Sequence, residues 1–209
     1  ILENFEADPE YNETFIYASN AIDYVDENTA LVIVDVNKPD YFECPDLINK
    51  TKTIVLIDHH LQSGDRVEPL ALLHHEPTAS SASEMVAELL QYISDEVKLK
   101  KVEAEALYAG ILIDTNYFSK NTGVRTFEAA AWLRKHGADT VEVKRLFQND
   151  LGSTLSRYEI LRHAELYKYD VALCPLDYTS DRIIAAQAAD ELLSISGIQA
   201  SFVYYPDGD

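Results

Sequence analysis

The 209-residue sequence has few basic side chains. It holds 17 Lys and Arg against 36 Asp and Glu, which gives a formal net charge of -19 at pH 7. Because a negative field repels polyanions, this charge argues against tight binding of long nucleic acid. Carboxylates can hold divalent cations, however, and a bound cation reverses the local sign of the charge. The composition therefore disfavours nucleic-acid binding and leaves a metal site open.

Cysteine and long hydrophobic runs are also scarce. The two cysteines, Cys44 and Cys174, are too few and too far apart in sequence for a thiolate metal site or a disulfide framework, so an intracellular, reducing setting is the simpler interpretation. No apolar run approaches the ~18 residues of a membrane span. With seven Gly, seven Pro and 47% hydrophobic residues, the sequence is typical of an ordered globular chain.

The first half of the sequence predicts a parallel β-sheet. Four short apolar runs lie at residues 15–18, 31–36, 53–57 and 70–73. The second and third are continuous and rich in β-branched residues, as expected for strands covered on both faces. The segments between the runs are long enough for crossover connections, which parallel pairing needs.

Helical patterns follow from residue 79 onward. The segment "TASSAS" precedes an amphipathic helix, with Ser81 and Glu84 as a predicted capping box. Further helices are predicted at 103–113, 126–136 and 140–149. Between the last two, Gly137 supplies a stop signal, and an Asp or Thr then supplies a start signal.

We predict an α/β fold made of two domains. Residues 1–152 form a parallel-sheet domain flanked by helices, and residues 153–166 form a polar-faced connecting helix. Residues 167–209 begin a second α/β domain, with a strand at 171–173, a helix at 182–193 and a strand at 200–205.

Metal-binding side chains end two of the predicted strands. "LVIVDVNKP" ends on Asp35, and "TIVLIDHH" ends on Asp58, His59 and His60. A third group, Asp114, closes the apolar helix "ALYAGILIDT". In open parallel sheets, ligands collect at the carboxyl ends of the strands, and Asp and His suit hard or borderline divalent ions. The fold must bring these groups together, since they are distant in sequence.

Structural roles remain open for several of these residues. A lone Asp35 is more often the cap of a turn, and Asp114 could equally cap a loop. Two adjacent histidines at a strand end are harder to explain as core, because neighbours in an extended chain face opposite ways. His74 and His75 have no acidic residue before them, so we assign them to the surface, with Glu76 solvated.

The motifs resemble those of the DHH phosphoesterases. The Asp58-His59-His60 triplet is the signature of that family, and Asp35 and Asp114 lie where two further motifs are expected. The segments "VDVNKPDYFECPDLINKTKTIVLIDHH", "EPTASSASEMVAELLQYI", "AGILIDTNYF" and "TGVRTFEAAAWLRKHGADT" are similar to the membrane-anchored cyclic-di-AMP phosphodiesterases of the GdpP type. The second domain resembles the start of the DHH-associated, substrate-binding domain of that branch.

The resemblance implies roles for the site residues. Asp35 would bridge two Mn2+ ions, His59 would ligate one of them, and Asp114 would help complete the pair. Asp58 would orient His59 through its free ring nitrogen, and His60 would contact the substrate phosphate. Two cations ~4 Å apart can bind one phosphate and stabilise its leaving oxygen.

Further substrate contacts are expected at a helix start and at one arginine. Ser80 and Ser81 offer backbone amides to an anion, although ordinary helix capping explains them as well. Arg125 is a candidate phosphate clamp or, equally, a surface residue. The resemblance also implies a homodimer, and a parent protein on the cytoplasmic face of the membrane in which this segment is soluble.

Two family features are missing from the sequence. Nothing before Asp35 fits the first motif, His-x-x-x-Asp-x-Asp, and the Gly-Gly-Gly-His segment of the associated domain is absent. Asn121 stands where the branch usually has Arg. We expect both missing features beyond the ends of this chain, which by itself should be inactive.

The expected activity is metal-dependent hydrolysis of cyclic-di-AMP to linear 5'-pApA. Two other activities of the same superfamily stay open: a nanoRNase or 3'-phosphoadenosine phosphatase, and a single-strand exonuclease, which the net charge disfavours. A non-catalytic nucleotide sensor is the alternative from another class. The complete set of Asp35, Asp58, His59, His60 and Asp114 argues against such decay.

Overall fold

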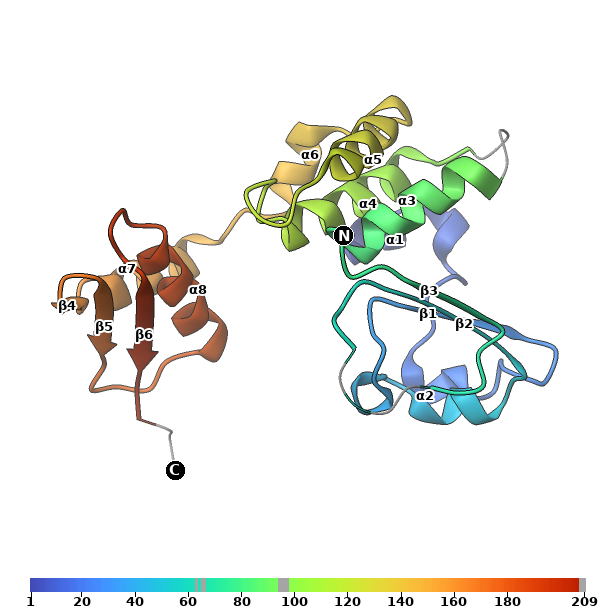
Figure 1. The fold of residues 1–209 in the computed structure, drawn as a ribbon, viewed down its shortest axis with the longest axis horizontal. Coiled ribbons are helices and arrows are strands. Elements are labelled where there is room, and N and C mark those ends of the chain that lie inside the picture. Colours follow the sequence, from blue (N-terminus) through green and yellow to red (C-terminus); the bar gives the residue numbers. More distant parts are fainter. Residues whose placement is uncertain (63, 65–66, 94–97, 207–209) are drawn as a thin grey trace. The chain divides into compact units, whose positions relative to one another are not determined.

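The computed structural model describes residues 1–62, 64, 67–93 and 98–206. The chain divides into two compact units, Ile1–Leu146 and Phe147–Asp209 (Figure 1). Among the described residues, no helix is both long enough and apolar enough to cross a bilayer.

The first unit is built on a three-stranded parallel sheet. Its strands are β1 (Ala30–Val34), β2 (Thr53–Asp58) and β3 (Leu72–His75), in the order β1-β2-β3. Val34 pairs with Ile57, and Asp58 pairs with His75. The carboxyl ends of all three strands therefore meet at one edge. The predicted parallel α/β fold is confirmed.

The apolar run at residues 15–18 is not a strand, which corrects the prediction. Residues 15–17 are irregular, and the short helix α2 (Ala18–Ala21) follows. The ring of Phe15 packs edge-on against the buried Phe5, at 5.4 Å between ring centroids. Phe5 belongs to helix α1 (Leu2–Glu6). This run therefore contributes to a local aromatic cluster and not to the sheet.

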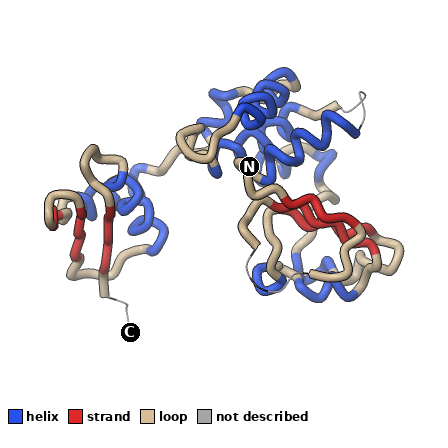
Figure 2. The backbone as a smooth tube through the Cα atoms, viewed as in Figure 1, coloured by secondary structure: helices blue, strands red, loops and turns tan. Residues whose placement is uncertain are grey.

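Helices lie on both sides of this sheet (Figure 2). On one side are α3 (Ala82–Ile93), α4 (Lys101–Asp114), α5 (Val124–Lys135) and α6 (Thr140–Arg145). α2 lies on the other side (Figure 1). Three short 3-10 helices, Pro9–Tyr11, Pro39–Tyr41 and Pro45–Asn49, complete the unit. The helices predicted at 103–113 and 126–136 match α4 and α5, whereas the one predicted at 140–149 ends at Arg145.

Small residues let the helices of this layer approach closely. The core between them includes Ala87, Ala104, Ile111, Ala129 and Leu133, all fully buried. Gly110 on α4 faces Ser83 on α3 so tightly that an added Cβ would lie 2.1 Å from the Ser83 Oγ and 3.0 Å from its Cβ. Gly110 therefore sets the distance between α3 and the helix that carries Asp114.

Replacing Gly110 with Ala should destabilise the protein. Because Ser83 cannot move its Cβ out of the way, we expect the free energy of unfolding to fall by about 1–3 kcal/mol, as for other overpacked cores. Urea denaturation measures the change. The double variant Gly110→Ala, Ser83→Gly removes the clash and should recover part of the loss. An unchanged stability in Gly110→Ala would contradict this close approach.

The predicted start of α3 is confirmed only in part. The Ser81 Oγ accepts a hydrogen bond from the Glu84 backbone N–H at 3.0 Å, as in a capping box. The Glu84 carboxylate, however, accepts from the backbone N–H of Ser80 at 3.3 Å and from its hydroxyl, one residue earlier than expected. Further along the chain, Gly137 takes a positive φ of 104°, and the Asp139 side chain caps α6 through the Val141 N–H.

The second unit pairs two helices with a small mixed sheet. It contains α7 (Leu151–Leu161), β4 (Glu165–Tyr167), β5 (Val171–Pro175), α8 (Arg182–Leu193) and β6 (Ala200–Tyr204). β4 runs antiparallel to β5, and β5 runs parallel to β6. Ile160, Ala172, Cys174, Ala188 and Leu192 form its buried core.

The helix predicted at 153–166 is shorter than expected. α7 ends at Leu161, and residues 165–167 form β4 because they pair with β5. α7 also packs on α8 and buries Ile160, so it contributes to the core of the second unit. The predicted domain boundaries at 152 and 166 stay predictions.

Candidate active site

Asp35 lies at the carboxyl end of β1, where the backbone turns sharply. Its φ of 63° is in the left-handed region, which Asp adopts more readily than most residues. The Asp35 N–H still donates to the Ile57 carbonyl at 3.0 Å, which holds the turn against β2. This conformation directs a half-exposed carboxylate toward the histidines that follow β2.

Three groups from distant parts of the sequence meet at this edge of the sheet. The His59 Nε2 lies 3.4 Å from the Asp35 Oδ1 and 3.8 Å from the Asp114 Oδ2. The His60 Nδ1 lies 3.9 Å from the same Asp35 oxygen. One ligand atom from each of Asp35, His59 and His60 lies within 4.8 Å of the others. The predicted convergence of Asp35 and His59 is confirmed, and Asp114 joins the cluster through His59.

Asp58 orients His60 and not His59, which corrects the expected contact. The Asp58 side chain is fully buried, and its Oδ1 lies 2.8 Å from the His60 Nδ1. Residues two apart in an extended chain share a side, whereas neighbours do not, so Asp58 reaches His60 more easily than His59. The His59 Nδ1 instead donates to the Ala79 carbonyl at 3.3 Å. That bond leaves the His59 Nε2 facing the two carboxylates.

The electrostatics of the cluster reflect its crowded carboxylates. The hydrogen bond that the His60 Nδ1 donates to the Asp58 carboxylate is the main cause that raises the pKa of His60 above its usual value. Burial raises the pKa of Asp114, and the nearby negative charge of Asp35 raises it further. Three carboxylates thus share one edge with two imidazoles. Such a set favours a bound cation, which would relieve the repulsion.

Sequence reasoning missed two residues that support the site. The Asn37 side-chain amide donates to the Asp58 Oδ2 at 2.5 Å and to the His60 carbonyl at 3.4 Å. The His75 Nε2 donates to that same carbonyl at 2.7 Å. His75 is half-buried and stands outside the ligand cluster. A usable signal for Asn37 was its place two residues after Asp35, on the loop that leaves β1.

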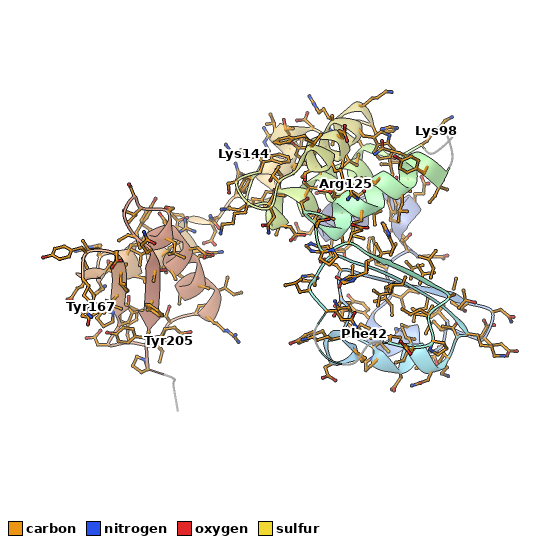
Figure 3. All side chains as sticks on the ribbon, in the orientation of Figure 1. Phe42, Lys98, Arg125, Lys144, Tyr167 and Tyr205 are labelled. Carbon is orange, nitrogen blue, oxygen red and sulfur yellow. The ribbon has the colours of Figure 1, made fainter. Side chains whose placement is uncertain are left out.

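The other side chains that we expected to bind substrate form hydrogen bonds with protein groups instead. Ser80 and Ser81 are almost completely buried and cap α3 together with Glu84. The guanidinium of Arg125, on α5 (Figure 3), donates to both carboxylate oxygens of Glu88, at 2.7 and 2.6 Å. Its Nη1 also lies 3.8 Å from Glu76. The roles of Ser80, Ser81 and Arg125 in substrate binding stay predictions.

Two hollows adjoin the cluster. The first has a volume of about 350 Å³ and is lined by Asp35, Val36, Asn37, Lys38, Tyr41, His60 and Leu61. The second, of about 360 Å³, lies between α3 and α4 and includes Asp35, Ser83, Gly110 and Asp114 in its walls. The carboxylate of Asp35 therefore borders both spaces.

Solved structures contain the same fold. An exopolyphosphatase-related protein from Bacteroides fragilis superposes with a TM-score of 0.79, over 91% of this chain and 59% of that one. The sequence identity is 22%, so this likeness bears on the fold alone.

Curated proteins are similar to this chain over most of its length. The cyclic-di-AMP phosphodiesterase GdpP of Bacillus subtilis (strain 168) is 42% identical over 192 residues, covering 90% of this chain and 29% of that protein. The cyclic-di-AMP phosphodiesterase PdeA of Listeria monocytogenes is 36% identical over 97% of this chain and 31% of its own length. The chain thus spans less than a third of these relatives.

A more distant relative has a different named activity. The bifunctional oligoribonuclease and PAP phosphatase NrnA of Mycoplasma pneumoniae is 35% identical over 117 residues, 54% of this chain and 34% of that protein.

The family model of the DHH family, N-terminal domain, matches residues 4–111, which is more than half of the chain. That segment includes the Asp58-His59-His60 signature and the sheet edge that presents it. This protein belongs to the DHH family.

Proposed function

We propose that the whole protein hydrolyses cyclic-di-AMP to linear 5'-pApA with the help of divalent metal ions. The observation that carries the proposal is the convergence of Asp35, His59 and His60, whose ligand atoms lie within 4.8 Å of one another. The named activity of the GdpP and PdeA relatives supports the substrate. Since the chain spans only part of their length, the activity is proposed for the full-length protein.

The donor set of the cluster fits a hard or borderline divalent cation. The Nε2 of His59 lies 3.4 Å from a carboxylate oxygen of Asp35 and 3.8 Å from one of Asp114. Such mixed oxygen and imidazole ligands suit Mn2+, and we propose two Mn2+ ions with Asp35, His59 and Asp114 among their ligands. When bound, the metal supplies Lewis acidity toward the phosphate and lowers the pKa of water.

The protein's own residues orient the scissile phosphate in this proposal. The buried Asp58 holds the His60 Nδ1, and the Asn37 amide holds Asp58 from its other oxygen. This arrangement leaves the His60 Nε2 as the ring nitrogen for a phosphate oxygen. Asp35 and His59 would hold the cation, and its charge would balance that of the phosphate.

A phosphatase or nanoRNase activity is the second candidate. The similarity to NrnA over 54% of the chain favours it. The greater coverage by the cyclic-di-AMP phosphodiesterases places it second. A sensor without catalysis is disfavoured because the chain retains Asp35, Asp58, His59, His60 and Asp114. From the resemblance to the membrane-anchored branch, we also propose a homodimer at the cytoplasmic face of the membrane.

A comparison of substrates tests the proposed function. Full-length protein is incubated with Mn2+ and cyclic-di-AMP, pApA or 3'-phosphoadenosine, and the products are separated by chromatography. We expect cyclic-di-AMP to turn over fastest and to give pApA. Faster cleavage of 3'-phosphoadenosine or pApA would favour the second candidate. Binding of cyclic-di-AMP without any product would indicate a sensor.

A further inference from the structure

The hollow of about 350 Å³ beside the cluster is lined in part by residues that have no role in the proposed cleavage. Asp35 and His60 line it, as do Lys38 and Tyr41. The volume lies at the lower end of the range for small-molecule sites, so it suits part of a dinucleotide. The Lys38 Nζ lies 5.6 Å from the centroid of the Tyr41 ring. A cation and an aromatic face thus stand together next to the proposed site of cleavage.

The backbone that carries Lys38 is fixed from both sides. Asn37 is tied to the buried Asp58 through its side-chain amide. Pro39 restricts the preceding residue to extended geometry, and Lys38 has φ −107° and ψ 128° accordingly. The Tyr41 N–H donates to the Lys38 carbonyl at 3.0 Å and closes the short 3-10 turn. The stem of Lys38 therefore starts from a defined position.

Lys38 has a charge that no carboxylate of the described residues neutralises within 4 Å. Arg125 differs, since Glu88 binds its guanidinium with two hydrogen bonds and Glu76 lies nearby. A dianionic substrate that approaches a chain of net charge −19 needs a cation apart from the metal. Lys38 is in place for this purpose, while a phosphate at Arg125 would have to displace Glu88.

We propose that Lys38 binds the phosphate of the cyclic dinucleotide that is not being cleaved, while the Tyr41 ring packs against the neighbouring base. The inference rests on the proposed function, because the second phosphate exists only in a substrate of this class. When one phosphodiester occupies the Asp35–His59 cluster, the other must lie in an adjoining space. The ammonium group matches its charge, and an aromatic ring stacks on any base.

Steady-state kinetics of full-length variants on cyclic-di-AMP test the proposal. For Lys38→Gln we expect KM to rise about 10-fold or more, equivalent to ~1.4 kcal/mol, with kcat within about 3-fold of wild type. Lys38→Arg should keep KM within about 3-fold, because the charge is retained. The KM of Lys38→Gln should also depend less on salt than the wild-type KM.

Lys52→Gln is the matched control, since Lys52 is exposed and pairs with Glu27 at 2.9 Å. It removes one positive charge from the chain and should leave KM unchanged. A KM within 2-fold of wild type in Lys38→Gln, while the wild type is active, would overturn the inference and leave the proposed function intact. Equal losses in Lys38→Gln and Lys38→Arg, with a lower melting temperature, would also overturn it. A wild type inactive on cyclic-di-AMP would contradict the proposed function itself.

Discussion

Replacing His59 with Ala should lower kcat/KM of the full-length protein for cyclic-di-AMP by at least about 1,000-fold, or ~4 kcal/mol. The imidazole lies between Asp35 and Asp114, at 3.4 and 3.8 Å, so its loss leaves two carboxylates without the nitrogen donor between them. The fold should persist, because the ring follows β2 at the sheet edge and is not part of the apolar core. Initial rates and thermal melting measure the two effects.

His163→Ala is the control for this prediction. His163 is exposed in the second unit, and its ring bonds only to the Glu159 carbonyl among the contacts described. Its replacement should leave the rate within about 2-fold of wild type. If His59→Ala keeps the wild-type rate, His59 is not a ligand in the reaction.

Replacing Asp58 with Ala should weaken both stability and catalysis. Asp58 is fully buried and accepts hydrogen bonds from the Asn37 amide and the His60 ring. Its removal leaves a buried space and takes the acceptor from two partly exposed donors, so we expect the free energy of unfolding to fall by about 1–3 kcal/mol. Since His60 loses its orientation, kcat should also fall by about 10–100-fold. Urea denaturation and initial rates measure the two changes.

Asp58→Asn separates the two effects. Its side chain has nearly the same shape and keeps one oxygen acceptor, so most of the stability should remain. It offers fewer acceptor atoms to Asn37 and His60 together, so kcat should stay below that of the wild type. Wild-type stability in Asp58→Ala would contradict the buried network around Asp58.

The sheet and its ligand-bearing edge could be predicted from sequence because the signals are strong and partly local. The β-branched runs at 31–36 and 53–57 indicate strands, and parallel pairing brings their carboxyl ends together. The expectation that both strands are covered on both faces holds for β2, which is largely buried, but is wrong for β1, where Val32 and Val34 are exposed. Asp35 and His59 therefore meet although 24 positions separate them, from 35 to 59. The run at 15–18 is also apolar, but it is partly aromatic and lies beside Phe5, a partner that local sequence does not specify.

The Asp58–His60 contact follows the alternation of side chains in an extended chain and was within reach of sequence reasoning. Other details within the site depended on contacts that no local pattern encodes. The two glutamates beside Arg125 come from the β3–α3 segment and from α3, so only the packed helices reveal that its charge is balanced. Lys38 and Tyr41 line the pocket beside Asp35 because the bond from Asn37 to Asp58 and the short 3-10 turn hold their backbone there.

Metal depletion of the full-length enzyme tests the central claim most directly, namely that cleavage of cyclic-di-AMP requires a divalent ion at the Asp35–His59 cluster. The protein is treated with a chelator, dialysed and assayed for pApA before and after Mn2+ is added. The account predicts no product without metal, a restored rate with Mn2+, and no restoration in His59→Ala. An undiminished rate in the metal-depleted enzyme would contradict it.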